Sequence, residues 1–301
     1  IQAHPSLAQA REGFELENRA GIPLEATQRN YRDDHHKPEM ICALTPFWAL
    51  CGFRPPAQSA RLLAKACGDR LGPLVDDLER GGQAALRRFF KSLLTLPVRE
   101  RDAALEAAFD YCRTSSEDAA HWRWIPRLAQ AYPGDIGALA PLFLNLVCLQ
   151  PGEGLFLPAG QLHAYLEGTG IEVMANSDNV LRGGLTPKHI DVPELLRVLK
   201  FQEKQVQVLT PDGGNDGEGT YSSPAEEFRL SVLDITTSDS YCSSEDRSVE
   251  ILLCVEGVVS IRPLQGGRPV DVSQGMSVLI PAATGAYSLT GRARLYKASV
   301  P

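Results

Sequence analysis

Three pairs of polar side chains in this sequence have residue types that can hold and use a metal ion. The members of each pair stand two residues apart: Gln2 and His4, Lys37 and Glu39, and His163 and Tyr165. Because side chains at i and i+2 of a β-strand point to the same face, the three pairs could line one barrel interior. Histidine nitrogen with carboxylate oxygen suits zinc, and a catalytic zinc keeps one coordination position open. Gln2 is the weakest candidate, since an amide oxygen is an uncommon ligand, and a lone histidine in a strand is more often structural.

The sharpest local pattern surrounds the second histidine. The pattern consists of Gly152, Pro158, Gly160 and His163. Five residues separate the first glycine from the proline, one separates the proline from the second glycine, and two separate that glycine from the histidine. This spacing resembles the second motif of cupins, which are small jelly-roll barrels that bind a metal inside. The first glycine opens a strand, the Pro-x-Gly turn needs a positive φ at its glycine, and the next strand points its histidine into the barrel.

A second copy of this pattern lies near the C-terminus and has lost its histidine. Gly275 and Pro281 keep the interval of Gly152 and Pro158, but Ala286 stands in the place of His163. If both segments are cupin strands, the first domain keeps a metal ligand and the second does not. The alternative is that both are ordinary glycine and proline turns between strands.

The chain alternates between strand-like and helical stretches that must position these residues. Residues 1–54 show no sustained helical period, whereas residues 55–145 repeat apolar residues at i, i+3 and i+4 between glycine and proline breakers. One further helix is expected at 192–201. The segment 212–224 is polar and turn-rich and predicts a linker or long loop. From residue 228 onward, β-branched residues and turn spacing favour a sandwich or jelly roll.

We therefore predict a mainly β protein with an inserted α-helical domain. The catalytic cupin or jelly-roll domain is expected to comprise 1–54 and 146–201, the helical domain 55–145, and a second, C-terminal jelly roll without a metal site 202–301.

Three stretches of the chain resemble the type I mannose-6-phosphate isomerases (phosphomannose isomerases). They are Q-A-H-P at 2–5, the run from Asp34 through H-K-P-E to Arg54, and the run from Pro158 to Val192, which contains the highly specific S-D-N-V-x-R-x-G-L-T-P-K. The resemblance covers essentially the whole chain in order. It implies one zinc ion per chain, with Gln2, His4, Glu39 and His163 as ligands.

The resemblance also implies a reaction and a substrate pocket. The family interconverts mannose 6-phosphate and fructose 6-phosphate through an enediol, and its pocket residues correspond to Lys37, Tyr165, Glu172, Arg182 and Lys188. Arg182 and Lys188 can close over a phosphate, the guanidinium as a fork and the ammonium as a point charge. Arg182, Glu172 and Lys37 are expected to act in catalysis. Glu172 is the first candidate for proton transfer. Lys37 and Tyr165 remain competitors.

Two departures from the family pattern accompany the resemblance. The asparagine that usually precedes H-K-P-E is His35, which supplies no expected ligand but is expected to affect the loop that carries Lys37. The family's strands before Q-A-H-P have no counterpart in this sequence, so an incomplete barrel is expected.

Composition limits the remaining function classes. There are 30 Lys and Arg residues against 37 Asp and Glu, a net charge of −7, which argues against nucleic acid or an anionic membrane as partner. No apolar run approaches the ~20 residues that span a bilayer. Seven scattered cysteines without a C-x-x-C pair indicate reduced thiols and a cytoplasmic protein. A non-catalytic bicupin for sugar binding or storage, and a cupin dioxygenase, are the alternatives; the first predicts eroded ligands in both domains and the second a multi-histidine iron site.

Overall fold

The computed structural model describes residues 1–213, 217–237 and 240–301. The N-terminal part contains two sheets with the strand orders β4-β3-β6-β1-β8 and β5-β2-β7. Their strands are β1 (Gln2–Ala3), β2 (Glu39–Ala43), β3 (Phe47–Phe53), β4 (Leu144–Leu149), β5 (Gly154–Leu157), β6 (His163–Glu167), β7 (Gly170–Met174) and β8 (Leu181–Arg182). Apolar side chains of both sheets share one buried cluster, in which Ile41 and Leu157 face Ala49 and Leu149. The two sheets therefore enclose a core, at one end of which the metal-ligand candidates lie.

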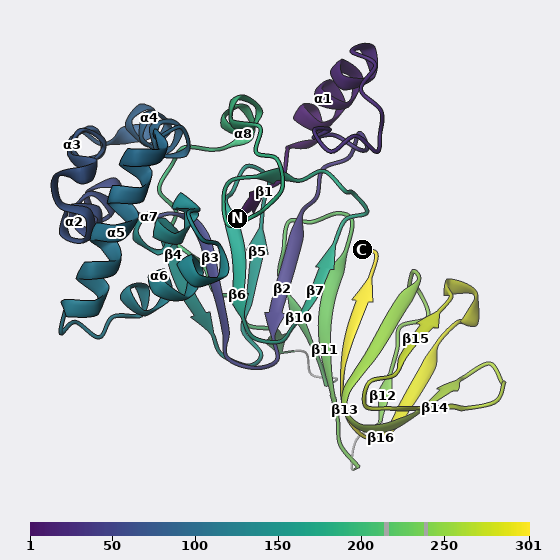
Figure 1. Ribbon diagram of the computed structural model, residues 1–301. Helices are drawn as coiled ribbons and strands as arrows, with labels where there is room; N and C mark the ends of the chain where they lie inside the picture. Colours follow the sequence, from purple (N-terminus) through teal and green to yellow (C-terminus); the bar gives the residue numbers. More distant parts are fainter. Residues whose placement is uncertain (214–216, 238–239) are drawn as a thin grey trace.

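Helices cover the outer face of the larger sheet (Figure 1). They are α2 (Pro56–Cys67), α3 (Gly72–Glu79), α4 (Gly82–Leu94), α5 (Val98–Thr114), α6 (Ala120–Ala131) and α7 (Ala140–Phe143). Helix α8 (Val192–Val198), later in the chain, lies beyond the ends of the strands and contacts α4 (Figure 1). The expected helical block and the expected helix near 192–201 are thus both present. Leu50 and Phe53 of β3 pack into the same buried cluster as Phe89, Phe90 and Phe143 from the helices.

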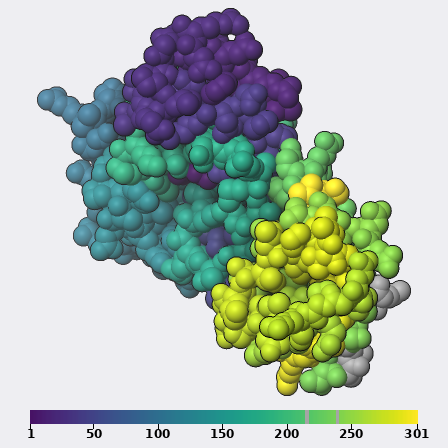
Figure 2. Space-filling model, turned by 90° about the vertical axis from the view of Figure 1, so that its right-hand side faces the viewer, coloured from purple at the N-terminus to yellow at the C-terminus, as the bar shows by residue number. Residues whose placement is uncertain are grey.

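Residues 1–54, which show no sustained helical period in the sequence, nevertheless contain a helix. Helix α1 (Leu7–Arg19) begins with a capping box in which Ser6 and Gln9 exchange hydrogen bonds. Within this helix only Ala10 and Gly13 are buried, so no apolar period marks it in the sequence. Figure 2 shows this N-terminal segment, in purple, covering one end of the molecule.

The described residues of the C-terminal part form one eight-stranded antiparallel sheet. Its main path is β14-β13-β16-β11-β10-β9, with β12 paired to β16 and β15 paired to β13. The strands are β9 (Asp212–Gly213), β10 (Glu218–Tyr221), β11 (Arg229–Ile235), β12 (Tyr241–Cys242), β13 (Glu250–Pro263), β14 (Val270–Ser273), β15 (Ser277–Ile280) and β16 (Tyr287–Ser299). One side buries its own apolar cluster, which includes Leu233, Leu252 and Leu295.

The segment 212–224 is not simply the expected linker. Strands β9 and β10 pair antiparallel and extend the C-terminal sheet, while residues 214–216 lie outside the part of the chain that is described. The other side of this sheet packs on the smaller N-terminal sheet, where Met40 and Cys42 meet Tyr221, Leu230 and Tyr296. Among the described residues, no helix is long and apolar enough to cross a membrane.

Candidate metal centre and active site

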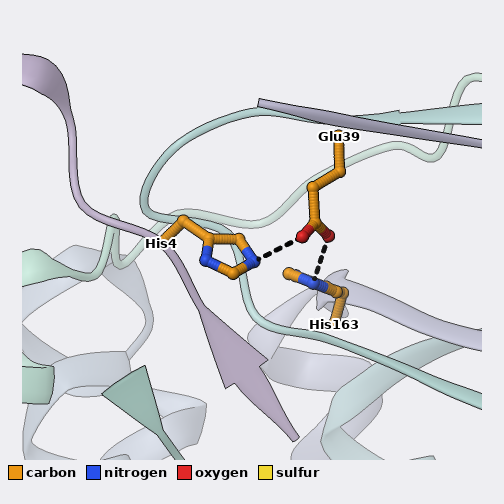
Figure 3. A group of neighbouring side chains, drawn as sticks. All are labelled: His4, Glu39 and His163. Carbon is orange, nitrogen blue, oxygen red and sulfur yellow. Dashed lines mark ion pairs between the residues drawn. The ribbon is translucent and has the colours of Figure 1, made fainter. Parts of the chain in front are cut away.

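Two histidines and a glutamate converge at the end of the N-terminal core (Figure 3). His4 follows β1 directly, Glu39 is the first residue of β2, and His163 is the first residue of β6. Both His4 Nε2 and His163 Nε2 lie 3.1 Å from a carboxylate oxygen of Glu39. Each of the three residues is 1% exposed. The antiparallel pairing of β1 with β6 holds Gln2 opposite His163, and thereby brings the chain's first residues to the site.

Backbone carbonyls determine which nitrogen of each histidine faces the centre. His4 Nδ1 lies 2.7 Å from the carbonyl oxygen of Asn179, and His163 Nδ1 lies 3.1 Å from that of Gln161. Since a carbonyl only accepts, each Nδ1 carries a proton and donates it. In the neutral ring, Nε2 then presents a lone pair toward Glu39.

Two of the converging atoms have no hydrogen-bond partner, and a bound cation would supply one. His4 Nε2 and Glu39 Oε2 are buried without a hydrogen bond. Burial lowers the pKa of His163, which opposes an imidazolium there. Two lone pairs and a carboxylate within 4.8 Å of one another therefore fit a divalent metal ion; ligand atoms on tetrahedral zinc stand about 3.3 Å apart.

Gln2 adjoins this group and links it to Arg182. Its Nε2 lies 3.2 Å from His163 Nε2, and its Oε1 accepts a hydrogen bond of 2.8 Å from Arg182 Nη1. A half-turn of the amide would bring its oxygen to the histidine nitrogens, and would also turn its NH2 group toward Arg182, which would then lose this acceptor. Gln2 therefore adjoins the other metal-ligand candidates. Arg182 pairs with Gln2 in the sheet, and burial lowers its pKa, although a guanidinium stays charged.

The three remaining acid and base candidates stand around the same centre. Lys37 Nζ lies 3.4 Å from Glu39 Oε1. The hydroxyl of Tyr165 donates a hydrogen bond of 2.9 Å to Glu172 Oε1. Burial raises the pKa of Tyr165 far above its ordinary value, so the phenol keeps its proton. Glu172 is exposed as a residue, but its carboxyl group is partly desolvated by the surrounding protein. This desolvation, and secondly the negative charge of Glu39, raise the pKa of Glu172.

A cationic pocket of about 420 Å³ opens beside Gln2 and contains four of the predicted residues. Gln2, Lys37, Arg182 and Lys188 all line it. Its lining also includes the cationic or titratable side chains Arg29, Arg32 and His189, against the single acid Asp178. Sequence analysis did not identify these three: Arg29 and Arg32 lie outside the stretches that resemble the family, and His189 follows Lys188 within the last of these stretches but was not singled out. Tyr165 and Glu172 are not part of this lining.

Sequence analysis also missed the residue that organises the loop before Glu39. The buried side chain of Asn179 accepts hydrogen bonds from the backbone of Arg32 and Asp33 and donates to the carbonyls of Asp33 and His35. Its own carbonyl accepts from His4. The S-D-N motif contains Asn179, so a signal was present. His35 itself is exposed, and Lys37 still reaches Glu39 despite the departure at this position.

The three predicted i and i+2 pairs are brought together only in part by strands. His163 and Tyr165 both lie in β6, but β1 ends before His4, and Lys37 precedes β2. In the residues that the structure describes, His4, Glu39 and His163 are the one group of His, Cys, Asp and Glu that could share an ion. Ala286 is buried directly before β16.

Comparisons with known proteins agree along the chain. A family model described as phosphomannose isomerase type I, catalytic domain, matches residues 1–56, and one described as mannose-6-phosphate isomerase, cupin domain, matches residues 217–300. The mannose-6-phosphate isomerase of Escherichia coli K12 is 39% identical over 299 residues, which cover 98% of this chain and 74% of that protein. The human enzyme of the same name is 33% identical over 302 residues, covering 94% and 69%.

Solved structures give the same result. A point mutant of phosphomannose isomerase from Salmonella typhimurium superposes with a TM-score of 0.91 at 36% identity, covering 99% of this chain and 75% of that one. A mannose 6-phosphate isomerase described as holo and zinc-bound superposes with a TM-score of 0.89 at 36% identity, with the same coverage.

Proposed function

The chain belongs to the type I mannose-6-phosphate isomerases, a family of isomerases, and we propose that it is a zinc-dependent aldose–ketose isomerase that interconverts mannose 6-phosphate and fructose 6-phosphate. The observation that carries the proposal is the buried group of His4, Glu39 and His163, whose electron-rich atoms converge without a proton between them beside a cationic pocket.

We propose one zinc ion per chain, held by Gln2, His4, Glu39 and His163. One carboxylate and three neutral ligands leave the ion with a net charge near +1. When bound, zinc supplies positive charge near the substrate oxygens where negative charge develops. The solved zinc-bound relative supports this identity of the metal.

Arg182 and Lys188 are proposed to bind the phosphorylated hexose. Both line the cationic pocket, and Arg182 also contacts Gln2 at the border of the metal centre. A guanidinium can fork onto two oxygens of a phosphate or of the reacting sugar, whereas the ammonium of Lys188 acts as a point charge. The excess of cations in this pocket explains how a chain with a net charge of −7 accommodates an anionic substrate.

The reaction requires a proton to move between C2 and C1 of the sugar, which we propose proceeds through an enediol. Glu172 is the first candidate to carry that proton, because its pKa is raised and so lies closer to neutral pH than the pKa of an ordinary glutamate. Tyr165 donates to this carboxylate and positions it. Lys37 stands against Glu39 and remains a competitor.

We also propose the division of the chain into a catalytic cupin of residues 1–54 and 146–201, a helical insertion of 55–145, and a C-terminal jelly roll of 202–301 without a metal. The cupin family model that matches residues 217–300 supports the last assignment. The non-catalytic bicupin predicts eroded ligands in both domains, whereas His4, Glu39 and His163 of the first domain still converge on one point.

Removal of one ligand tests the proposal. We expect the wild-type chain to hold one zinc by X-ray fluorescence and to convert mannose 6-phosphate in an enzyme-coupled assay, with activity lost to a chelator and restored by zinc. His163→Ala should lose metal and activity together, since removing a ligand weakens binding severely. His189→Ala, in the neighbouring pocket, is the control and should keep its zinc. Stoichiometric zinc in His163→Ala, or two tightly held ions per wild-type chain, would contradict the assignment.

A further inference from the structure

A second cavity, larger than the pocket beside the metal centre, lies in the C-terminal sheet. It has a volume of about 640 Å³, and its walls come from strands β10, β11, β12, β13 and β16 together with the segment before β13. We call it the C-terminal cavity. The residues that line it are Glu218, Thr220, Arg229, Tyr241, Ser244, Asp246, Arg247, Ser248, Glu250, Lys297, Ser299, Val300 and Pro301. Most of them carry a charge or a hydroxyl.

The cavity opens from the core side of the sheet. Glu250 stands two residues before Leu252 in β13, and Lys297 stands two residues after Leu295 in β16. Alternation along each strand places Glu250 on the face of Leu252 and Lys297 on the face of Leu295. Both leucines are fully buried. The polar residues therefore occupy the end of an apolar core, as the metal-ligand candidates do in the first domain.

Buried charges form a network at the base of the cavity. Lys297 Nζ lies 2.7 Å from Glu218 and 3.1 Å from the hydroxyl of Tyr241. The hydroxyl of Tyr287 donates a hydrogen bond of 2.9 Å to Glu250, whose other oxygen lies 3.5 Å from Lys297. Glu250 and Lys297 are 4% and 7% exposed. Because burying an ion pair contributes little net stability, apolar residues would stabilise this core equally well.

The network stands beside the degenerate copy of the cupin motif. Ala286 takes the place of His163, and the next residue, Tyr287, reaches Glu250. In the first domain, the converging nitrogens and carboxylate have no proton between them. At this end of the C-terminal sheet, by contrast, the hydroxyl of Tyr241 and the ammonium of Lys297 already lie beside the carboxylates. Glu218 and Glu250 are neutralised by Lys297 and by Arg247, whose Nη1 lies 3.4 Å from Glu250, so two acids meet two cations without a metal ion. This end of the sheet still retains a cavity large enough for a small ligand.

We propose that the C-terminal cavity is a metal-independent binding site for a small ligand that carries several hydroxyls and one anionic group, as a sugar phosphate or a hydroxy acid does. Carboxylate oxygens have lone pairs beyond those used in the network, and these accept from ligand hydroxyls. Thr220, Tyr241 and Ser244 add hydroxyls to the lining. Arg229 stands exposed at the first position of β11, opposite Ser299, and meets the anionic group.

Heteronuclear NMR of the zinc-loaded chain tests this site, with glucose 6-phosphate as the probe. We expect the amide signals of Thr220, Tyr241 and Ser299 to shift in a saturable manner. Signals of Asn30 and Asp178 report separately on the pocket beside the metal centre, so the outcome does not depend on the proposed isomerase activity. Glucose alone and inorganic phosphate alone should each bind more weakly than the sugar phosphate.

A charge reversal at the rim distinguishes the site from general attraction of anions. Arg229→Glu should weaken binding at the C-terminal cavity roughly tenfold or more, which corresponds to the loss of one charge-assisted contact. Arg268→Glu, an exposed arginine of the same domain that does not line the cavity, should leave binding unchanged. The proposal is overturned if the signals of the cavity do not shift, if both variants behave alike, or if phosphate alone binds as tightly as glucose 6-phosphate.

Discussion

At the scale of single residues, the proposed metal centre depends on His4 Nε2 and His163 Nε2 carrying no proton, so that each offers a lone pair. The meeting of His4, Glu39 and His163 agrees with the resemblance of the Q-A-H-P, H-K-P-E and H-A-Y motifs to those of the family, while the role of these residues and of Gln2 as zinc ligands stays a prediction. The carbonyls of Asn179 and Gln161, which fix the tautomers of His4 and His163, could not be predicted from the sequence. Every residue has a carbonyl, so nothing in a side-chain pattern shows which one will face a histidine.

Arg182 is expected to act on the reaction rather than on the metal. Arg182→Ala should lower kcat about a hundredfold, roughly 3 kcal/mol of transition-state stabilisation, because one charge-assisted contact in a partly desolvated site is lost. Zinc content should stay at one per chain. Steady-state kinetics with metal analysis measures both quantities.

The distribution of that loss assigns the role of Arg182. A lower kcat with little change in KM places the guanidinium on the transition state, and a higher KM alone makes it a phosphate anchor. Arg182→Lys should recover little, since an ammonium cannot fork onto two oxygens. Near wild-type activity in Arg182→Ala, with full metal occupancy, would place this residue outside the active site.

At the scale of elements, the loop before Glu39 is held by one side chain. Asn179 is completely buried and bonds the backbone of Arg32, Asp33 and His35, while its carbonyl accepts from His4. We expect Asn179→Ala to weaken zinc affinity about 10–100-fold, the range found when groups behind metal ligands are changed. A competition titration with a chromogenic chelator measures this affinity.

Matched variants separate positioning of the ligands from a general loss of stability. Asn179→Asp keeps the acceptor oxygen for the Arg32 and Asp33 amides but replaces the donor to the Asp33 and His35 carbonyls by a second acceptor, so its zinc affinity should fall at least as far as that of Asn179→Ala. Ser59→Ala, at a buried site of the helical domain, should leave zinc affinity unchanged. If Asn179→Ala melts at a lower temperature but binds zinc as wild type does, its role is structural only.

Helix α1 shows why a surface helix escapes prediction from periodicity. It is fixed by close contact rather than by an apolar stripe: a Cβ on Gly13 would stand 2.3 Å from the ring of Tyr31. That ring cannot move aside easily, because it is buried and its hydroxyl bonds Glu194 and Arg197. Its capping box was the signal available in the sequence.

Gly13→Ala should therefore destabilise the chain by about 1–3 kcal/mol, the usual cost of overpacking. This is the reverse of the gain of about 1 kcal/mol that helix propensity alone predicts. Urea denaturation measures the difference. Gly72→Ala is the control, since an added Cβ there meets no atom within 4 Å apart from its chain neighbours; with only the restriction imposed by the following proline, it should cost clearly less than Gly13→Ala. Equal effects of the two substitutions would contradict the close contact at Gly13.

At the scale of the whole molecule, two β units of different chemistry are joined through the smaller sheet and through an ion pair between His36 and Glu227. The sequence predicts the order of β, helical and β regions well, because helical periodicity and strand-like alternation differ strongly. It does not predict the C-terminal cavity. Glu218, Glu250 and Lys297 come from three separate strands, and only the pairing of β10, β11, β13 and β16 brings them together.

The ion network of the C-terminal cavity should make stability depend on pH. Burial by itself would raise the pKa of Glu218, but hydrogen bonds from Lys297 and Tyr241 outweigh it and lower that pKa. A lowered pKa means that the folded chain binds this proton less readily than the unfolded chain does. Its contribution is then present above the unfolded glutamate value of about 4.3 and is lost as pH falls through the folded value.

Glu218→Gln removes this carboxylate while keeping its size, so it tests that linkage. At pH 7 we expect the variant to unfold at a lower urea concentration than wild type, with a free energy of unfolding smaller by about 1–3 kcal/mol. The reason is that the buried ammonium of Lys297 loses its closest partner. The difference should shrink as the pH is lowered from 7 toward 3, since wild type then loses the same charge. Glu245→Gln, an exposed residue outside the network, should follow wild type at every pH. A difference between Glu218→Gln and wild type that does not change with pH would show that the ionised carboxylate of Glu218 contributes nothing to folding, and that the side chain acts only through its shape.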